Sequence, residues 1–194
     1  MISRIHGTVI YRDTDRVEVE TSGGVVYEVE VPLTVLQRLP SVGTRVELRT
    51  QQVVSENSVA LYGFIDAHER TLFRRLLTAS GVGAKLALAL LSTYSAPRLA
   101  QALVERDLAA LTQVSGVGKK TAERISLELA DRVKDLAFAP EGASGPSPLL
   151  EGAVSALVAL GYGFADADAL VRKALAEGEG LTTEELIRKA LAGS

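Results

Sequence analysis

The spacing of apolar residues changes after Phe64, and this change constrains the fold more than any other feature of the sequence. Before it, apolar and polar residues alternate, as in the sequence VEVE at residues 17–20. A period of two is typical of strands that bury one face. After it, apolar residues recur at spacings of three and four, which is typical of amphipathic helices. We therefore expect a multidomain α+β chain whose β domain covers residues 1–64.

The β domain has room for five strands and two clear turns. Gly23-Gly24 separates two alternating runs and predicts a hairpin, while the polar residues 55–58 (SENS) separate two later runs. Pro32 ends the strand before it, and a short helix or turn follows at residues 33–39. A small antiparallel barrel fits five short strands, and the OB-fold is the commonest such barrel. The pattern alone does not distinguish an OB-fold from an SH3-like barrel.

The middle segment, residues 65–138, has an all-helical pattern built on two helix–turn–helix units. Asp66 is well placed as the N-cap of the first helix, and Asp107 as the N-cap of a short later helix. We expect further helices at residues 84–91, at 96–104 with Pro97 in the first turn, and at 119–136.

A proline-rich segment separates this helical domain from the C-terminus. Residues 139–148 (APEGASGPSP) hold three of the six prolines and no bulky apolar residue, which predicts a flexible linker. The remaining residues, 149–194, show three short amphipathic patterns, at 149–160, 166–176 and 182–191. A tethered module of this size is more often a docking element than a catalytic one. We therefore expect a three-helix docking domain.

A short phrase occurs twice in the helical segment. Residues 80–85 read SGVGAK and residues 115–120 read SGVGKK, at an offset of 35 residues. Each copy predicts a glycine turn that opens a helix, where free backbone N–H groups and nearby lysines attract an anion. One copy alone would also fit an ordinary tight connection between helices. Two copies indicate a sequence-independent clamp for nucleic-acid phosphates, formed by Gly81, Gly83, Lys85, Gly116, Gly118, Lys119 and Lys120.

The charge distribution agrees with this interpretation. The whole chain has a net charge of −3, but residues 66–136 carry +3, whereas residues 1–65 carry −2 and residues 137–194 carry −4. The segment with the repeated phrase is the only basic third, as expected for one nucleic-acid-binding face. Cysteine is absent, which excludes disulfides and thiolate metal sites. No run of about 18 apolar residues occurs, so we expect no membrane span and a cytoplasmic protein.

Candidate catalytic groups are sparse. His6 and His68 are the only histidines and lie in different expected domains. The second copy of the phrase does not complete the ATP-binding P-loop pattern, because Gln113 stands where the first glycine of that loop is needed. Asp13 and Asp15 are a carboxylate pair of the kind that binds Mg²⁺, although aspartates are also favoured in turns. We therefore expect no catalytic residue, metal site or cofactor, with a metal nuclease that uses Asp13 and Asp15 as the enzymatic alternative.

Several phrases in a fixed order resemble the RuvA family, which comprises bacterial Holliday-junction-binding subunits of the RuvAB branch-migration complex. They are LYGF at residues 61–64, ERTLF at 69–73, GVGAKLA at 81–87, GVGKKTAER at 116–124 and ALVALGY at 156–162. The resemblance covers the whole chain. It implies an N-terminal OB-fold, a double helix–hairpin–helix domain and a mobile, UBA-like three-helix domain.

The resemblance also implies a function and partners. It implies a non-catalytic subunit that binds four-way junction DNA, holds it open and planar, and stimulates the hexameric RuvB ATPase. The setting would be homologous recombination, DNA repair and the SOS response, in the cytoplasm and on the nucleoid. It further implies a homotetramer that can pair into an octamer on DNA, and a larger complex with the RuvC resolvase. A generic helix–hairpin–helix accessory protein and a pure protein–protein adaptor remain as rival functions.

Individual residues take roles from the same resemblance. Ala84 and Arg124 join the DNA-binding phrases, and Glu56 and Asn57 take the place of an acidic pin near the junction centre. A second acid is common in the family where Asn57 stands, and proline is usual where Ala84 stands. We therefore expect weaker repulsion from a pin with one acid. The RuvB-facing apolar residues would be Leu157, Leu160, Tyr162 and Leu191.

Overall fold

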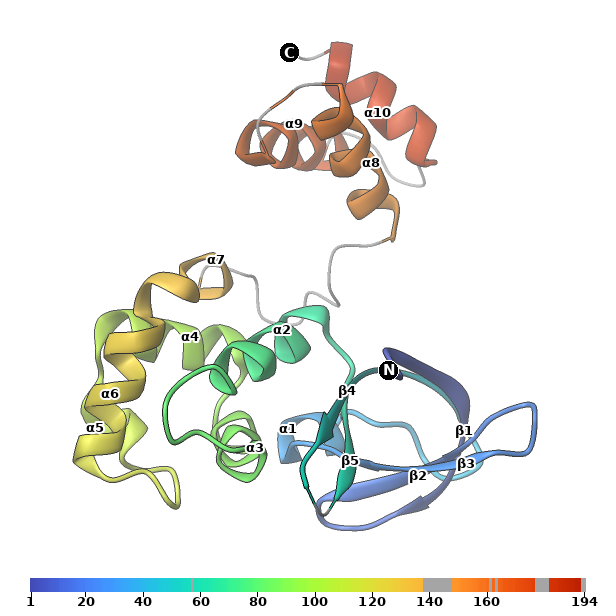
Figure 1. The fold of residues 1–194 in the computed structure, drawn as a ribbon. Helices are drawn as coiled ribbons and strands as arrows, with labels where there is room; N and C mark the ends of the chain where they lie inside the picture. Colours follow the sequence, from blue (N-terminus) through green and yellow to red (C-terminus); the bar gives the residue numbers. More distant parts are fainter. Residues whose placement is uncertain (57, 138–147, 161, 163, 177–181, 193–194) are drawn as a thin grey trace. The chain divides into compact units, whose positions relative to one another are not determined.

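The computed structural model describes the chain as two compact units, Met1–Ala143 and Ser144–Ser194 (Figure 1). Each unit has its own hydrophobic core and is described by itself. Within the described residues, no helix is both long and apolar enough to cross a membrane. The described residues are 1–56, 58–137, 148–160, 162, 164–176 and 182–192.

The first unit begins with a closed barrel of short strands. These strands are β1 (Arg4–Arg12), β2 (Arg16–Glu20), β3 (Val26–Glu30), β4 (Arg45–Val54) and β5 (Val59–Phe64). They follow the order β1-β2-β3-β5-β4 around the barrel, and β1 closes it by pairing with β4. Neighbouring strands are antiparallel except β3 and β5, which are parallel where Glu30 pairs with Tyr62. This is the strand order of an OB-fold, so the OB-fold prediction is confirmed and the SH3-like alternative is wrong.

The alternating pattern explains the interior of the barrel and its turns. Val17 and Val19 on β2 are fully buried, while Glu20 is exposed. Gly24, in the predicted hairpin turn, has a φ of +79°, a conformation that glycine adopts without steric cost. Pro32 is extended and precedes the short helix α1 (Leu33–Leu36), as the sequence predicts.

The rest of the first unit is helical. Its elements are α2 (Ala67–Leu76), α3 (Ala84–Thr93), α4 (Ala96–Glu105), α5 (Leu108–Leu111), α6 (Lys119–Leu129), the 3-10 turn η1 (Ala130–Arg132) and α7 (Lys134–Ala137). Both predicted N-caps are confirmed. The Asp66 carboxylate accepts from the His68 amide at 2.7 Å, and the Asp107 carboxylate accepts from the Ala110 amide at 3.0 Å. Glu69 completes a capping box at the start of α2.

The prediction of one long helix over residues 119–136 is wrong. The helix α6 ends at Leu129, and the chain continues through η1 into α7. The break lets Val133 turn into the core, where α7 packs against α4. The Arg75 guanidinium supports the break by donating a hydrogen bond to the carbonyl oxygen of Arg132. The sequence shows no break because the apolar positions on both sides of it fit one helical pattern.

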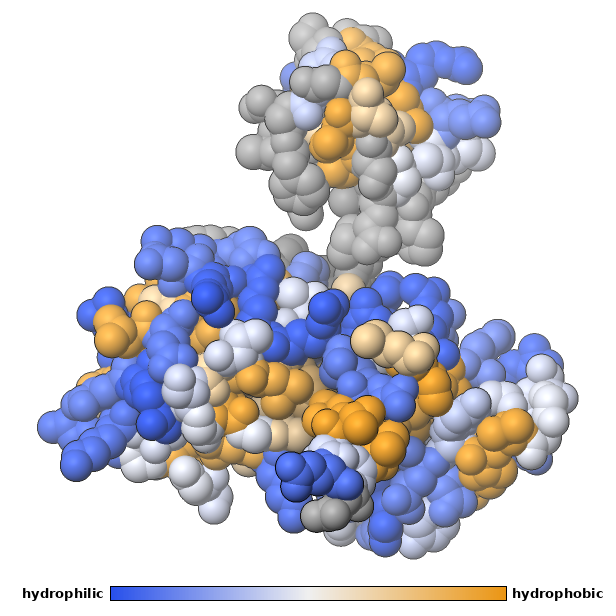
Figure 2. Space-filling model, in the orientation of Figure 1, coloured by the Kyte–Doolittle hydropathy of each residue, from blue (hydrophilic) through white to orange (hydrophobic). Residues whose placement is uncertain are grey.

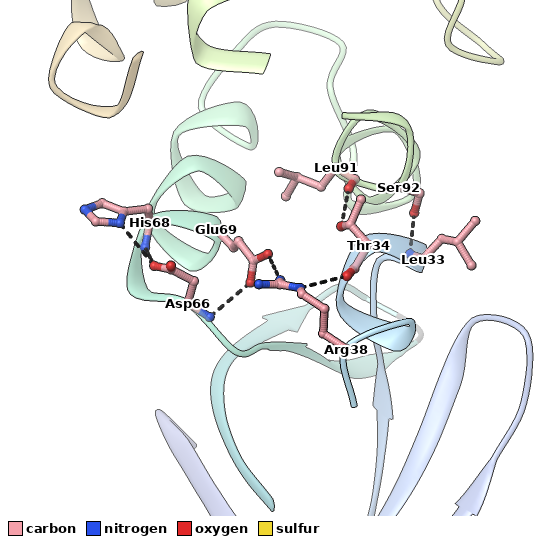
Figure 3. Close-up of polar contacts among 8 residues, drawn as sticks. All are labelled: Leu33, Thr34, Arg38, Asp66, His68, Glu69, Leu91 and Ser92. Carbon is pink, nitrogen blue, oxygen red and sulfur yellow. Dashed lines mark hydrogen bonds and ion pairs between the residues drawn. The ribbon is translucent and has the colours of Figure 1, made fainter. Parts of the chain in front are cut away.

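The barrel and the helices share one hydrophobic core, with polar contacts at its edge (Figure 3). The ring centroid of Phe73 on α2 lies 4.9 Å from that of Tyr62 and 5.1 Å from that of Phe64, both on β5. Nearby, the Arg38 guanidinium forms an ion pair with the buried Glu69 carboxylate. Burial raises the pKa of Glu69, while its backbone hydrogen bond and the guanidinium charge act in the opposite direction.

A second set of contacts attaches α1 to α3. The Thr34 hydroxyl donates to the Leu91 carbonyl at 2.7 Å, and the Leu33 amide donates to the Ser92 hydroxyl at 3.0 Å (Figure 3). The Arg38 Nε atom donates to the Thr34 carbonyl at 3.0 Å and links both sets. These bonds attach the C-terminal end of α3 to the barrel, and the first repeated glycine phrase lies at the other end of this helix.

The second unit is a small helical domain. It contains α8 (Pro148–Ala159), α9 (Phe164–Ala176) and α10 (Thr183–Ala192). The buried core includes Ala153, Val154, Leu157, Ala167, Val171, Ala174, Leu186 and Ala190. A capping box fixes the start of α10, where the Thr182 amide donates to the Glu185 carboxylate at 2.8 Å. The predicted linker, residues 139–148, lies outside the described residues except for Pro148, which begins α8.

One buried polar group offers a test of the helical packing. The Ser126 hydroxyl on α6 lies in a residue that is 1% exposed, and it has no hydrogen-bond partner among the described residues. An unpaired buried hydroxyl is unfavourable, and alanine is the better helix former. We therefore expect Ser126→Ala to raise the free energy of unfolding by about 0.5–1 kcal/mol in urea denaturation. A loss of stability would instead reveal a partner for the hydroxyl, such as a buried water.

Candidate nucleic-acid interface

The repeated phrase forms the same turn in both places. Gly81 and Gly116 have φ angles of +74° and +87°, in the left-handed region that favours glycine. Val82 and Val117, the next residue of each copy, are buried. Each valine amide donates to the carbonyl three residues earlier, at 3.1 Å for Val82 and 3.0 Å for Val117. The α2–α3 and α5–α6 connections are therefore two copies of one structure.

The second glycine of each copy is not required by the fold. Gly83 and Gly118 have φ angles of −88° and −84°, which other residues adopt readily. A Cβ atom built at either position meets no atom within 4 Å. Both glycines are the N-caps of helices and border open space. The absence of a side chain there lets a ligand approach the backbone closely.

The helices that follow, α3 and α6, offer donors and positive charge at the same place. Neither helix has a side-chain cap, so the N–H groups of the first turn remain available to an anion. Lys85, Lys119 and Lys120 are exposed, and no ion pair of the described residues involves them. Ala84, the first residue of α3, has a small side chain that leaves this approach open. The positive end of each helix dipole adds to the lysine charge.

The two turns are neighbours, because each is covered by the helix of the other. A Cβ atom at Gly81 would clash with the Arg124 guanidinium, which reaches over from α6. A Cβ atom at Gly116 would lie 3.4 Å from Cδ1 of Leu86 on α3. Arg124 therefore lies at the first turn although it comes from the helix of the second. The two candidate anion sites are therefore neighbours, with the Arg124 cation against the first of them.

Glu128 is a residue of this surface that the sequence does not indicate. Its carboxylate accepts a hydrogen bond from the Ser80 amide at 2.8 Å and so attaches the first turn to α6. This backbone hydrogen bond lowers the pKa of Glu128, and the charges of Arg124 and Arg132 act in the same direction. One glutamate on a helix surface is ordinary, and its partner is 48 positions away, so the sequence carries no signal for the contact.

The predicted pin is the turn of the β4–β5 hairpin. The Ser55 amide donates to the Ser58 carbonyl at 2.8 Å, and the two hydroxyl oxygens lie 2.7 Å apart. Glu56 is exposed, and no ion pair of the described residues involves it. Asn57 lies outside the described residues. Ser55 and Ser58 thus close the end of the hairpin, and the charge of Glu56 next to Ser55 is exposed to solvent.

The groups considered for catalysis lie in ordinary structural settings. The Asp13 carboxylate accepts from the Thr14 amide at 2.7 Å and lies 3.8 Å from Arg16 Nε, as in a turn. Within the described ranges, no three His, Cys, Asp or Glu side chains gather as a metal site would require. His6 lies on β1, whereas His68 lies in the first turn of α2.

The C-terminal unit corrects one prediction about the partner-facing surface. Leu157 is fully buried in the core of this unit, so the prediction that its side chain faces a partner is wrong. Leu160, just after α8, is 63% exposed. Tyr162 and Leu191 are half-buried and pack on the same core. Four apolar residues near helix ends give no sequence signal for which of them points inward, because a short helix uses most of its apolar residues for its core.

Three family models match the sequence and together span most of it. They describe a RuvA N terminal domain at residues 1–63, a SAM-like helix-hairpin-helix tandem at 73–131 and a RuvA C-terminal domain at 148–194. The chain is also 46% identical to the Holliday junction branch migration complex subunit RuvA of Gemmatimonas aurantiaca, over 98% of this chain and 97% of that protein. The chain belongs to the RuvA family.

Other RuvA proteins match over the full length of the chain. The subunits of the same name from Pseudomonas putida and Pseudomonas aeruginosa are each 44% identical to it, over 100% of this chain and 98% and 99% of theirs. The RuvA N-terminal match covers the barrel except the last residue of β5, and the tandem match contains both glycine turns. The RuvA C-terminal match contains α8, α9 and α10. The resemblance found in short phrases is therefore confirmed.

The two glycines of a RuvA turn should respond differently to substitution. Serine is a favourable N-cap, so we expect Gly118→Ser to change the free energy of unfolding by less than about 0.5 kcal/mol. It should nevertheless weaken duplex DNA binding about tenfold, because its side chain occupies the open space and its hydroxyl takes a backbone donor. Urea denaturation and fluorescence anisotropy with a labelled duplex measure the two effects.

The matched control is Gly81→Ser, which places a side chain at a positive φ and against the Arg124 guanidinium. We expect this variant to lose about 2 kcal/mol or more of stability. Equal losses of stability in the two variants, or unchanged DNA binding by Gly118→Ser, would contradict the assignment of the second glycine to a ligand.

Proposed function

We propose that this chain binds four-way junction DNA without sequence specificity, as the non-catalytic DNA-binding subunit of a branch migration complex. The paired glycine turns carry the proposal, because they are two neighbouring anion sites made of backbone donors and lysines. Such sites suit phosphates and have no means of reading base edges. The names of the relatives, subunits of Holliday junction branch migration complexes, support the same function.

A preference for junctions would come from several copies of the chain. One copy offers one pair of turns, which suits one DNA arm. A homotetramer with fourfold symmetry would arrange four pairs around a centre, and two such tetramers would enclose the junction as an octamer. Glu56 would then lie near the centre, where its charge repels phosphates and keeps the exchanging strands apart. Since Asn57 is neutral, each copy contributes one acid to this repulsion.

The motor would be a separate protein. We propose that a hexameric RuvB ATPase docks on the surface formed by Leu160 with the exposed edges of Tyr162 and Leu191. An exposed leucine beside half-buried apolar residues suits contact with another protein. We also propose the RuvC resolvase as a member of the larger complex, and the cytoplasm as the place where it acts on DNA.

A binding assay tests the proposal. We expect a four-way junction to bind at least about tenfold more tightly than a linear duplex of the same length, because only the junction engages several pairs of turns at once. Raising the salt concentration should weaken both, with log K falling by about 0.9 per phosphate contact for each log unit of salt. Equal affinity for junction and duplex would favour a generic helix–hairpin–helix accessory protein instead.

The same samples test whether the chain is a nuclease or a protein–protein adaptor. Incubation of the junction with Mg²⁺ should leave the DNA intact. Cleavage that disappears in Asp15→Ala would favour a metal nuclease, and absence of DNA binding at low salt would favour an adaptor.

The docking surface predicts that DNA binding and motor stimulation can be separated. Removing residues 149–194 should leave junction affinity within about twofold, because the glycine turns lie in the other compact unit. The same truncation should abolish stimulation of RuvB ATPase activity. In the full chain, Leu160→Ser should reduce stimulation, whereas Leu175→Ser, at another exposed leucine, should not. Stimulation that survives both the truncation and Leu160→Ser would locate the partner surface elsewhere.

A further inference from the structure

Two apolar side chains lie on the pin hairpin, directly beside its turn. Val54 at the end of β4 and Val59 at the start of β5 are each 67% exposed, and their Cα atoms are paired across the two strands. Among the large apolar residues that the structure describes, only Met1 and Leu127 are more exposed. Figure 2 shows apolar surface near this end of the hairpin. The pin therefore has an acidic tip and an apolar shoulder.

The hairpin holds these two side chains in a fixed position. The next pair of residues, Ser55 and Ser58, closes the turn with a backbone hydrogen bond of 2.8 Å and a hydroxyl contact of 2.7 Å. Valine is stiff at χ1 because it branches at Cβ. A preference for β-strands does not explain valine here, because threonine fits a strand equally well and is better solvated. The pair forms a rigid apolar ridge whose exposure to water has no structural purpose in the isolated chain.

The charge beside the ridge limits what can cover it. Glu56 is next to Ser55 and carries an exposed carboxylate, so DNA phosphates are repelled from the tip. The uncharged, apolar parts of DNA are the faces of its bases. These faces become accessible where base pairs unstack, as they must when strands exchange partners at a moving crossover. Apolar side chains are known to insert at such steps in bent DNA.

A hollow next to Val59 offers room for a displaced base. It has a volume of about 270 Å³ and lies between β3 and the start of β5. Its walls include the apolar residues Tyr27 and Leu61 and the carboxylates of Glu28 and Glu30. Carboxylates exclude phosphates but accept hydrogen bonds from base amino groups. The hollow therefore suits a base and does not suit the backbone of DNA.

We propose that Val54 and Val59 form an apolar wedge that packs against unstacked bases at the junction centre and holds the crossover base pairs open. The inference rests on the junction-binding function proposed above. It adds apolar packing against base faces, which the charged groups of the pin and the turns do not provide. In this division of roles, Glu56 keeps the phosphates apart and the valine pair stabilises the opened bases. The wedge is the more useful in this chain because the pin carries a single acid.

The test replaces both valines by threonine in the full chain. Threonine keeps the shape and the strand preference of valine but exposes a hydroxyl, so the hairpin should fold normally. Junctions with thymines at the crossover are saturated with protein and treated with permanganate, which oxidises unstacked thymines. The wild-type protein should raise crossover reactivity above that of free junction. We expect Val54→Thr with Val59→Thr to lose at least about two thirds of this increase, with junction affinity within about threefold.

A matched control uses another exposed valine pair of the same barrel. Val25 and Val26, beside the β2–β3 turn, are 51% and 44% exposed, and their double threonine variant should react like the wild type. If Val54→Thr with Val59→Thr raised the permanganate reactivity of the crossover thymines as much as the wild type does, the wedge proposal would be overturned. Light scattering without DNA gives a second check. If the mass of the Val54→Thr with Val59→Thr assembly differed from that of the wild type, the valines would be in contact with a second copy of the chain, and the wedge would again be overturned.

The experiment separates this inference from the proposed function. If the wild-type chain shows no preference for junction over duplex, the junction-binding function fails and the wedge fails with it. If the preference is present and the threonine pair changes nothing at the crossover, only the wedge is wrong.

Discussion

The packing of Phe73 against β5 is the contact on which the rest of the structure depends. β5 starts at the pin hairpin, and the Phe73 ring lies against Tyr62 and Phe64 near its other end. Phe73 belongs to α2, which leads directly into the first glycine turn. The ion pair of Arg38 with Glu69 supports the same contact from the barrel. One strand and one helix thus join the β4–β5 hairpin and the first glycine turn into a single body.

The repeated phrase combines two constraints that look identical in the sequence. The first glycine of each copy is demanded by the backbone, because only a residue without Cβ adopts the turn at low cost. The second glycine is free of such a demand and borders open space. The fold therefore explains the first glycine of the motif, and the second, which no contact requires, is the one we assign to an approaching ligand. The lysines follow the second glycine, where the open donors are.

Features with a local signal could be predicted from the sequence, and features that depend on distant partners could not. Alternation gave the barrel strands, and Asp66 marked a cap because its partner is two residues away. The break within residues 119–136 depends on packing against α4, and the role of Glu128 depends on an amide 48 positions away. The two copies of the repeated phrase predict where the glycine turns lie in the sequence, but not that the turns are neighbours in space. The sequence does not reveal that Leu157 is buried, because in a small domain a leucine is equally suited to the core and to a partner-binding surface.

Positions 81 and 124 are in contact, so a change at one alters the surroundings of the other. A side chain at position 81 would need both the left-handed backbone and the space that the Arg124 guanidinium now fills. Asparagine tolerates that backbone, but its side chain would displace the Arg124 guanidinium, which is the far end of a flexible side chain. The displaced cation would no longer lie against the first turn. A lineage that replaces this glycine therefore keeps its arginine but changes where the positive charge lies.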